Sequence, residues 1–393
     1  MQPKCFGGFL RGLTKTVLSQ LLSLATVVMF ATPGVAQNYK ILHNFDKKDG
    51  VFPRTGVTLD AAGNVFGVSN IGGAYGFGDV YRISPPSNEF FAIDFSSPKN
   101  GGGPHGPLAI DGAGNLFGAS PGGGEGCGTV FEWKAGETTL HFIPLPATAG
   151  CHPYSNVVID KAGNLFGTVV EAGANKDGGI FELSAGGKFS LVYSFNAAVD
   201  GTQTNGLAID NAGNVYGTNF SGGANGSGTL FALGTNGTFR IIHAFSGGYD
   251  GQAPDSIVTI DSQGNIYGTT SGGGNSCGLI YKFDKTGAET VLYAFDCVIG
   301  NGPEGPFTFD AQGNLYGTVV GRGAYGAGTI FKLDPSGNLT VIHNFGYYPD
   351  GYTPYTGLVQ DQTGNFYGTT SLGGTGICGQ EYYGCGVVFE ITP

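Results

Sequence analysis

Histidine and glutamate side chains in loops are the residues with which this chain could carry out acid–base chemistry. Four of the six histidines recur at one position of a repeated strand, which marks them as structural: His43, His141, His243 and His343. The other two, His105 and His152, lie in loops, and Glu304 is a candidate acid partner. Such a set could serve a lyase or hydrolase. No fixed His–Glu spacing supports catalysis, so we favour a non-enzymatic function.

Aspartate side chains gather in the same loops. Asp-Gly pairs begin at Asp49, Asp200, Asp250 and Asp350. A calcium ion needs roughly six to eight oxygens converging on one point. Aspartates spread along a repeat cannot converge on one ion. We therefore interpret these pairs as turns and expect no metal or other cofactor, with calcium as the alternative.

Loop tyrosines combine an apolar ring with a hydroxyl group, which suits contact with a sugar or a peptide surface. We predict a ligand surface there, and the alternative is packing between glycine-rich loops. The candidate binding residues are Tyr75, Tyr154, Tyr249, Tyr325, Tyr348, Tyr352 and Tyr355. Phe77, Tyr347, Tyr382 and Tyr383 lie in the same loops.

One repeated motif must position all of these residues. Asp-x-x-Gly-Asn-(Val/Leu/Ile/Phe)-(Phe/Tyr)-Gly begins at Asp60, Asp111, Asp160, Asp210, Asp261, Asp310 and Asp361, at steps of 49 to 51 residues. A near-constant period of this kind is typical of repeat architectures. The aspartate can accept backbone N–H bonds and the glycine can adopt a positive φ, so the motif predicts a hairpin turn.

Each period contains four expected strands. In one copy they are residues 205–210, 214–218, 229–233 and 239–245, with a glycine-rich loop at 221–228. The 74 Gly, 29 Phe and 19 Tyr with only 12% charged residues also favour short strands joined by tight turns. The sequence therefore predicts an all-β protein whose repeats are four-stranded antiparallel sheets.

The two ends of the repeat region predict a closed ring. The chain ends with a third-type strand at 387–391, while a lone fourth-type strand at 39–45 precedes the first full repeat. Pairing these two strands removes two exposed sheet edges. We predict a seven-bladed β-propeller closed in this way. A β-solenoid is the rival, but its coils lack regular hairpin turns.

The repeat resembles the bacterial GloVer tandem-repeat family across residues 39–393. The best copy reads Asn314-Leu315-Tyr316-Gly317-Thr318, Gly328-Thr329-Ile330-Phe331-Lys332-Leu333-Asp334 and Thr340-Val341-Ile342-His343-Asn344-Phe345. More distantly it is similar to NHL-type propeller repeats. That likeness implies that segments such as 206–210 line the central channel and that segments such as 239–245 lie at the rim. The family implies no common reaction.

Six cysteines follow the first 36 residues. Cys127 and Cys277 occupy equivalent glycine loops, and Cys151 and Cys297 fall in the next loops between blades. We predict disulfides Cys127–Cys151, Cys277–Cys297 and Cys378–Cys385. The rival is a metal site, but the chain has no Cys-x-x-Cys spacing.

Residues 1–36 have the pattern of a secretory signal peptide. Lys4, Arg11 and Lys15 precede an apolar stretch at 17–30, and Ala36 ends a cleavage site of small residues. The stretch is shorter than the ~20 apolar residues of a membrane span. Residues 37–393 would form a single domain, secreted or periplasmic, and cleavage would change the formal net charge from −11 to −14.

These features together predict an exported, monomeric binding or scaffolding propeller that contacts a glycan or a protein through its tyrosine-rich loops. The negative charge makes nucleic acid a poor partner. The alternative function is an exported lyase or hydrolase with a loop His/carboxylate site, at His105, His152 and Glu304, near the channel mouth.

Overall fold

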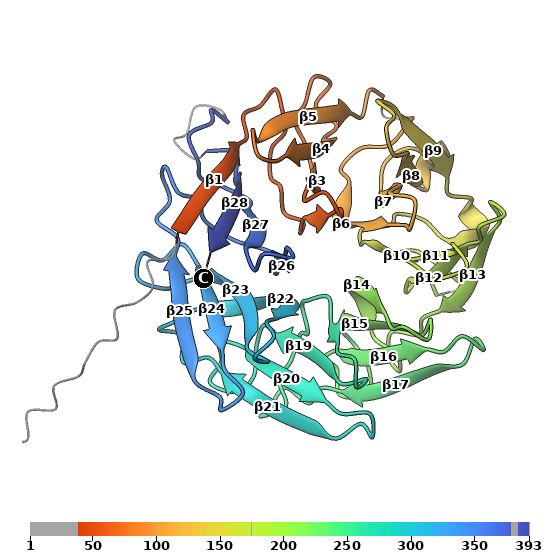
Figure 1. The fold of residues 1–393 in the computed structure, drawn as a ribbon. Helices are drawn as coiled ribbons and strands as arrows, with labels where there is room; N and C mark the ends of the chain where they lie inside the picture. Colours follow the sequence, from red (N-terminus) through yellow and green to blue (C-terminus); the bar gives the residue numbers. More distant parts are fainter. Residues whose placement is uncertain (1–37, 98, 174, 379–383, 393) are drawn as a thin grey trace, which may run out of the picture. The chain divides into compact units, whose positions relative to one another are not determined.

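A computed structural model of the chain describes residues 38–97, 99–173, 175–378 and 384–392. The predicted signal peptide and Tyr382 and Tyr383 lie outside these residues. The described strands form seven antiparallel sheets of four strands each, and the sheets are arranged in a ring (Figure 1). The predicted seven-bladed β-propeller is confirmed.

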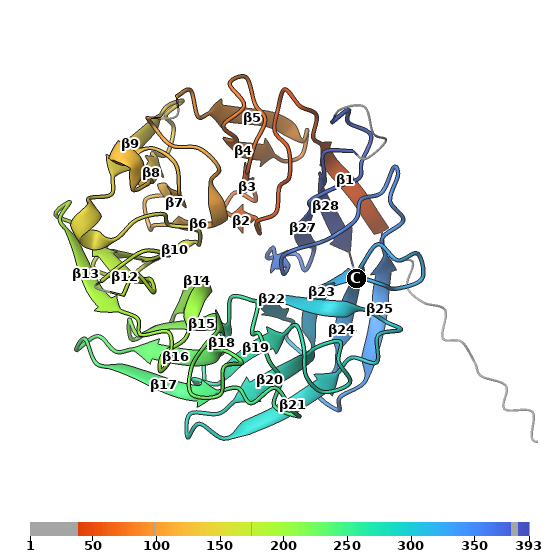
Figure 2. The same cartoon turned by 180° about the vertical axis from the view of Figure 1, so that it is seen from behind.

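Each blade runs from the centre of the ring to its rim (Figures 1 and 2). The inner strands are β2 (Thr58–Leu59), β6 (His105–Ile110), β10 (Val157–Ile159), β14 (Thr202–Ile209), β18 (Thr259–Ile260), β22 (Asn301–Phe309) and β26 (Val359–Gln360). The second strands are β3 (Val65–Ser69), β7 (Leu116–Ser120), β11 (Leu165–Val169), β15 (Val215–Ser221), β19 (Ile266–Thr270), β23 (Leu315–Gly321) and β27 (Phe366–Thr370).

The remaining strands complete the blades toward the rim. The third strands are β4 (Asp79–Ser84), β8 (Thr129–Trp133), β12 (Gly179–Leu183), β16 (Thr229–Leu233), β20 (Leu279–Phe283), β24 (Thr329–Leu333) and β28 (Val387–Thr392). The outer strands are β5 (Glu89–Asp94), β9 (Leu140–Pro144), β13 (Phe189–Ser194), β17 (Phe239–Ala244), β21 (Glu289–Ala294), β25 (Leu339–Asn344) and β1 (Asn38–Asn44). Two short 3-10 helices, η1 (Gly124–Gly126) and η2 (Ala147–Ala149), lie in loops.

The repeated motif forms the turn between the first two strands of every blade. In the fifth blade, Asp261 Oδ1 accepts the backbone N–H groups of Gln263 and Asn265 at 2.8 and 2.9 Å. Its Oδ2 accepts the Asn265 side-chain amide at 2.6 Å and the Tyr267 hydroxyl at 3.1 Å. These bonds use both carboxylate oxygens, so the motif aspartates serve the fold.

The core lies between neighbouring blades. One buried cluster joins Ile180 and Phe195 of the third blade to Leu207, Phe231 and Leu233 of the fourth. Within a blade, the aromatic ring of the third strand lies against the motif glycine of the second: a Cβ added to Gly217 would lie 2.5 Å from Phe231 Cζ. The absence of a side chain at the motif glycine is therefore required for the aromatic ring of the third strand to pack there.

The seam of the ring repeats the contacts found elsewhere. β1 pairs antiparallel with β28, with Lys40 opposite Glu390, as Figure 1 shows for the first and last coloured segments. Thr369 Oγ1 of the last blade donates to Thr55 O of the first at 2.9 Å, as Thr318 does to Thr356 O at 2.8 Å between the sixth and seventh blades. The predicted closure is confirmed.

Most rim histidines bond to the Asp-Gly pairs. His43, His243 and His343 each place Nε2 within 3.0 to 3.1 Å of Asp49, Asp250 and Asp350, respectively. Tyr193 donates to Asp200 in the same way, at 3.0 Å. The predicted equivalence of His141 is wrong. It lies opposite Glu132, and Ile143 occupies the position opposite Val130 that corresponds to His243 opposite Leu230.

Candidate functional site

One side chain from each blade surrounds the mouth of the central channel. Each stands four residues after a glycine that every blade carries: Gly50, Gly101, Gly150, Gly201, Gly251, Gly300 and Gly351. The seven side chains, which we call the mouth ring, are Arg54, His105, Tyr154, Asn205, Asp255, Glu304 and Tyr355. They line one cavity of about 160 Å³. No other repeated position described above varies so widely in chemistry.

A common backbone turn presents the mouth ring. Two residues before each ring residue, φ is positive in all seven blades, at Phe52, Gly103, His152, Gln203, Ala253, Gly302 and Thr353. Residues other than glycine rarely adopt a positive φ, because this backbone conformation costs them roughly 1 kcal/mol or more. Hydrogen bonds to the preceding blade hold it: His152 N donates to Cys127 O at 2.8 Å and Thr353 N donates to Ala327 O at 3.0 Å.

The basic arc of the mouth ring consists of Arg54 and His105. The Arg54 guanidinium lies 5.0 Å from the centre of the Phe52 ring and 5.6 Å from that of Tyr355. The Asn70 side-chain amide lies 3.0 Å from His105 Nε2, which can accept this bond only when unprotonated. Burial, and then the Arg54 charge, lower the pKa of His105 to about 4. His105 is therefore neutral at pH 7.

The acidic arc consists of Asn205, Asp255 and Glu304. Burial raises the pKa of Asp255 to about 6. Burial, and then the neighbouring charge of Asp255, raise the pKa of Glu304 well above its usual range. Glu304 is 7% exposed, and no hydrogen bond from the described residues reaches its carboxyl group. Both carboxyl groups are therefore harder to ionise than exposed ones, although Asp255 is still mostly ionised at pH 7.

Tyr154 and Tyr355 stand between the two arcs, one on each side. They are 51% and 42% exposed, and the ring of Tyr154 lies 5.2 Å from that of His105. The other described tyrosines of the predicted surface do not line the cavity. Tyr75, Tyr249, Tyr325 and Tyr348 are exposed singly in the loops, and Tyr352 packs against Tyr347 with ring centres 4.8 Å apart.

The three residues predicted for catalysis are brought together only in part. His105 and Glu304 line the same cavity, whereas His152 does not and instead directs Nδ1 toward Pro121 O at 3.4 Å. Sequence reasoning missed Arg54, Asn205 and Asp255. Their signal is present in the sequence as the fixed offset of four residues from the repeated glycine.

The three predicted disulfides are present, and two of them brace the loops around the mouth. Cys127–Cys151 and Cys277–Cys297 each join a glycine loop to the next loop between blades. Cys378–Cys385 closes a loop in the last blade. Disulfides persist in oxidising compartments, so these bonds are consistent with export. In the described residues, no helix is long and apolar enough to cross a membrane.

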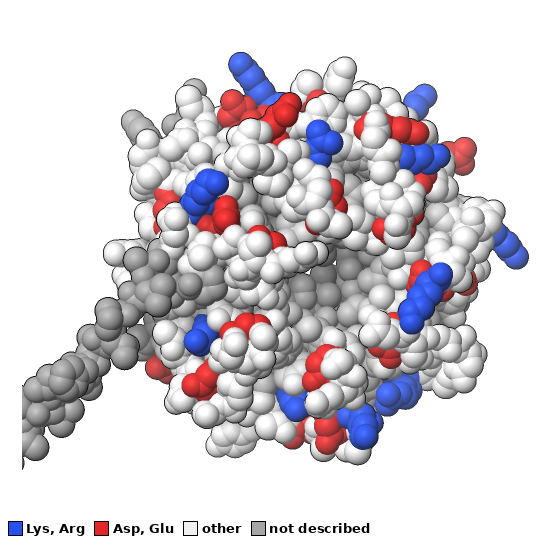
Figure 3. Space-filling model, viewed as in Figure 1, with Lys and Arg blue, Asp and Glu red and all other residues white. Residues whose placement is uncertain are grey.

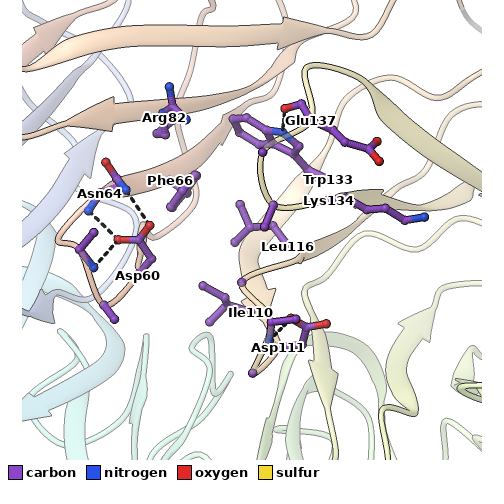
Figure 4. A pocket seen from close by; sticks show the side chains of 17 residues that line it. Asp60, Asn64, Phe66, Arg82, Ile110, Asp111, Leu116, Trp133, Lys134 and Glu137 are labelled. Carbon is purple, nitrogen blue, oxygen red and sulfur yellow. Dashed lines mark hydrogen bonds between the residues drawn. The ribbon is translucent and has the colours of Figure 1, made fainter.

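A larger cavity of about 530 Å³ lies between the first two blades, among their hairpin turns. Figure 4 shows Phe66, Leu116 and Trp133 on its walls, with Asp60 bonded within its own turn. A similar cavity of about 370 Å³ lies between the fifth and sixth blades. We interpret both as gaps between packed blades, because each lies among the hairpin turns and core side chains of two neighbouring blades, although the buried Nε of Arg82 in the larger one also has no hydrogen-bond partner among the described residues.

One group of described side chains has the composition of a metal site. Potential ligand atoms of His243, Asp250 and Glu289 lie within 4.8 Å of one another. His243 and Asp250 already form the rim contact that His343 and Asp350 form without a glutamate beside them. The group is explained by the repeat, and nothing in it indicates a bound ion.

Charged side chains are scattered over the blades rather than gathered in one patch, and the visible face is hollowed at the centre of the ring (Figure 3). The fold and the mouth ring define a seven-bladed propeller made of similar repeats, with side chains that differ between blades at the mouth of its channel. The chain matches the Gloeobacter/Verrucomicrobia repeat over residues 7–231 and 202–393, and it belongs to that family. The predicted GloVer relationship is thus confirmed.

No curated protein matches the chain in sequence. Among solved structures, the extracellular domain of a putative hybrid two-component system from B. thetaiotaomicron has a TM-score of 0.59 and 12% identity, covering 90% of this chain and 39% of that one. A second such domain from the same organism has a TM-score of 0.56 and 15% identity, covering 88% and 40%.

A third similar structure, a puromycin-hydrolyzing peptidase from Mycobacterium tuberculosis, has a TM-score of 0.54 and 12% identity, covering 83% of this chain and 51% of that one. The chain spans about two fifths of the length of the sensor chains it matches. These likenesses show the fold alone.

Proposed function

We propose that this protein is an exported binding module that holds one sugar residue of a glycan in the mouth ring. The observation that carries the proposal is the difference between blades. Turns and core glycines repeat from blade to blade, whereas the ring position is Arg, His, Tyr, Asn, Asp, Glu and Tyr in turn. Stability alone does not call for six different residue types among the seven side chains at one channel.

The size of the cavity supports a sugar rather than a protein surface. A volume of about 160 Å³ has room for one small ring. A stable protein partner needs roughly 800 Å² of surface on each side. Exposed tyrosines beside polar groups suit a sugar, because the aromatic ring covers its apolar face while hydroxyl groups bond to the polar side chains. Export rests on the predicted signal peptide and the disulfides.

A glycan array probed with the mature protein tests this proposal. The Tyr154→Ala/Tyr355→Ala variant removes the aromatic members of the mouth ring, and binding should fall at least about tenfold. The matched control is Tyr249→Ala/Tyr348→Ala, which removes two exposed tyrosines of the loops that lie outside the cavity. The proposal fails if no glycan binds, or if only the control variant loses binding.

An exported glycoside hydrolase is the second candidate, and the acidic arc favours it over the predicted His105/His152 pair. Asp255 and Glu304 line one cavity, burial raises the pKa of both, and glycoside hydrolysis uses a pair of carboxyl groups of which one acts as an acid. The test is to incubate the protein with a glycan that binds on the array and to measure the reducing ends released. Hydrolysis by the wild type that is lost in Glu304→Gln and in Asp255→Asn would support this second candidate. Binding without any product would contradict it.

A further inference from the structure

We infer that the sugar held by the mouth ring is an acidic one, with its carboxylate on Arg54 and its hydroxyl groups on the acidic arc. This inference rests on the proposed function, since it names the class of ligand for that site. It depends on three observations: a cation without an ionic partner, a buried carboxyl without a hydrogen bond, and their separation by a tyrosine.

Arg54 is the cation. Within the described residues it forms no ion pair and its side chain donates no hydrogen bond, although two aromatic rings fix its position. A guanidinium group presents its N–H donors in a planar fork that matches a carboxylate in two parallel bonds. An unpaired arginine held at a cavity wall is therefore a receptor for a carboxylate.

Glu304 is the buried carboxyl group. It is 7% exposed, it lines the same cavity, and no described residue bonds to it. Because its carboxyl oxygens have no partner in the described residues, a sugar hydroxyl group, which can donate or accept a hydrogen bond, complements them. Asp255 and Asn205 beside it add two further acceptors, and Asn205 already donates to Pro254 O at 2.8 Å.

The order of residues around the ring selects the ligand. Tyr355 stands between Glu304 and Arg54, so one ring-shaped molecule lying against it reaches both arcs. A neutral sugar would leave Arg54 unpaired. An amino sugar would bring an ammonium group beside the Arg54 guanidinium, and like charges repel. A sugar with a carboxylate satisfies both arcs, which makes a uronic acid the best fit.

Calorimetric titration with three methyl glycosides, those of glucuronic acid, glucose and glucosamine, tests the inference. The glucuronide should bind at least about tenfold more tightly than the glucoside, because a charge-assisted pair is added. In Arg54→Gln the ratio should fall to about one, because the glucuronide loses far more affinity than the glucoside does. The matched control is Arg322→Gln, an exposed arginine outside the cavity, which should keep the preference.

Equal affinities for glucuronide and glucoside, or tightest binding of the glucosaminide, would overturn the inference and leave sugar binding in place. A preference that survives in Arg54→Gln would overturn it too. If none of the three binds, the class named here is wrong, whereas the broader proposal is judged separately by the glycan array. Unchanged thermal unfolding of both variants establishes that each is folded.

Discussion

The ring of Tyr39 stacks on the imidazole of His343, with centres 4.1 Å apart and planes inclined by 5°. Tyr39 belongs to β1 in the last blade and His343 to β25 in the sixth, so the stack joins two blades. His343 also bonds to Asp350 in the loop that leads to Tyr355. The N-terminal strand is thereby fixed to its neighbouring blade as well as to β28.

Replacing Tyr39 should open the seam. We expect Tyr39→Ala to lower the free energy of unfolding by about 3 kcal/mol, because it removes a ring that packs on His343 and Phe389. Chemical denaturation measures this loss. The neighbouring exposed Asn38→Ala serves as control and should change stability by no more than about 0.5 kcal/mol. Equal effects of both substitutions would contradict the role assigned to the stack.

Removing the carboxyl group of Glu304 should stabilise the protein at alkaline pH. A pKa raised by folding means that the folded state binds the proton more tightly, so wild-type stability declines as pH rises above about 4.3, the ordinary pKa. Glu304→Gln stays neutral and avoids this loss. Its gain over wild type should be about 1 to 3 kcal/mol larger at pH 8 than at pH 5.

Urea unfolding at the two pH values measures that difference. The control is Glu89→Gln, the same substitution at an exposed residue of β5, whose effect should not depend on pH in this way. A constant gain at both pH values would show that Glu304 is ionised at little cost. Sugar binding should weaken in Glu304→Gln, although the amide can still donate and accept hydrogen bonds. Stability gained while affinity is lost is expected of a residue kept for function.

A methyl group on the second strand should disturb the blade. Gly217→Ala places a Cβ about 2.5 Å from Phe231 Cζ, and the ring must move. Overpacking of this kind costs about 1 to 3 kcal/mol, which thermal unfolding detects. Gly112→Ala is the control, because a Cβ there meets nothing within 4 Å. A loss at Gly112 as large as at Gly217 would contradict the packing argument.

Loss of Cys277–Cys297 should weaken both the fold and the mouth. The bond links residues 20 apart, and removing it as Cys277→Ser/Cys297→Ser should cost about 3 kcal/mol. Cys378–Cys385 links residues only 7 apart, so its removal should cost about 1 kcal/mol less. Only the first pair lies close in sequence to Glu304, so only its loss should reduce sugar affinity. Equal losses of affinity would contradict this.

The architecture could be predicted from the sequence because its determinants are local. Each Asp-x-x-Gly-Asn turn is made by one carboxylate and its own neighbours, as at Asp261, and the motif is complete in all seven copies. The closing strand was predictable for the same reason, since β1 has the pattern of outer strands such as β17 and β25. The register of individual strands was harder to predict. His141 was misplaced because it lies opposite Glu132, two residues before Ile143, the β9 residue that corresponds to His243.

The mouth ring could be predicted only in part. His105, Tyr154, Glu304 and Tyr355 were proposed because of their residue types, but in two separate roles. Arg54 and Asp255 were not noticed, since an arginine or an aspartate after a proline looks like any loop residue. Only their surroundings distinguish them: burial raises the pKa of Asp255, and the exposed Arg54 lies at the wall of the same cavity, and neither fact is encoded in a motif.

Because all seven residues of the mouth ring follow the same kind of backbone turn, each position can be substituted independently of the others. Each side chain lies two residues after a residue with positive φ and four residues after a glycine, so one can be exchanged without altering the backbone of the next. The propeller therefore presents seven side chains from structurally equivalent backbone positions around one cavity. Randomising residues 54, 105, 154, 205, 255, 304 and 355 while keeping the repeats should yield folded proteins with new sugar preferences.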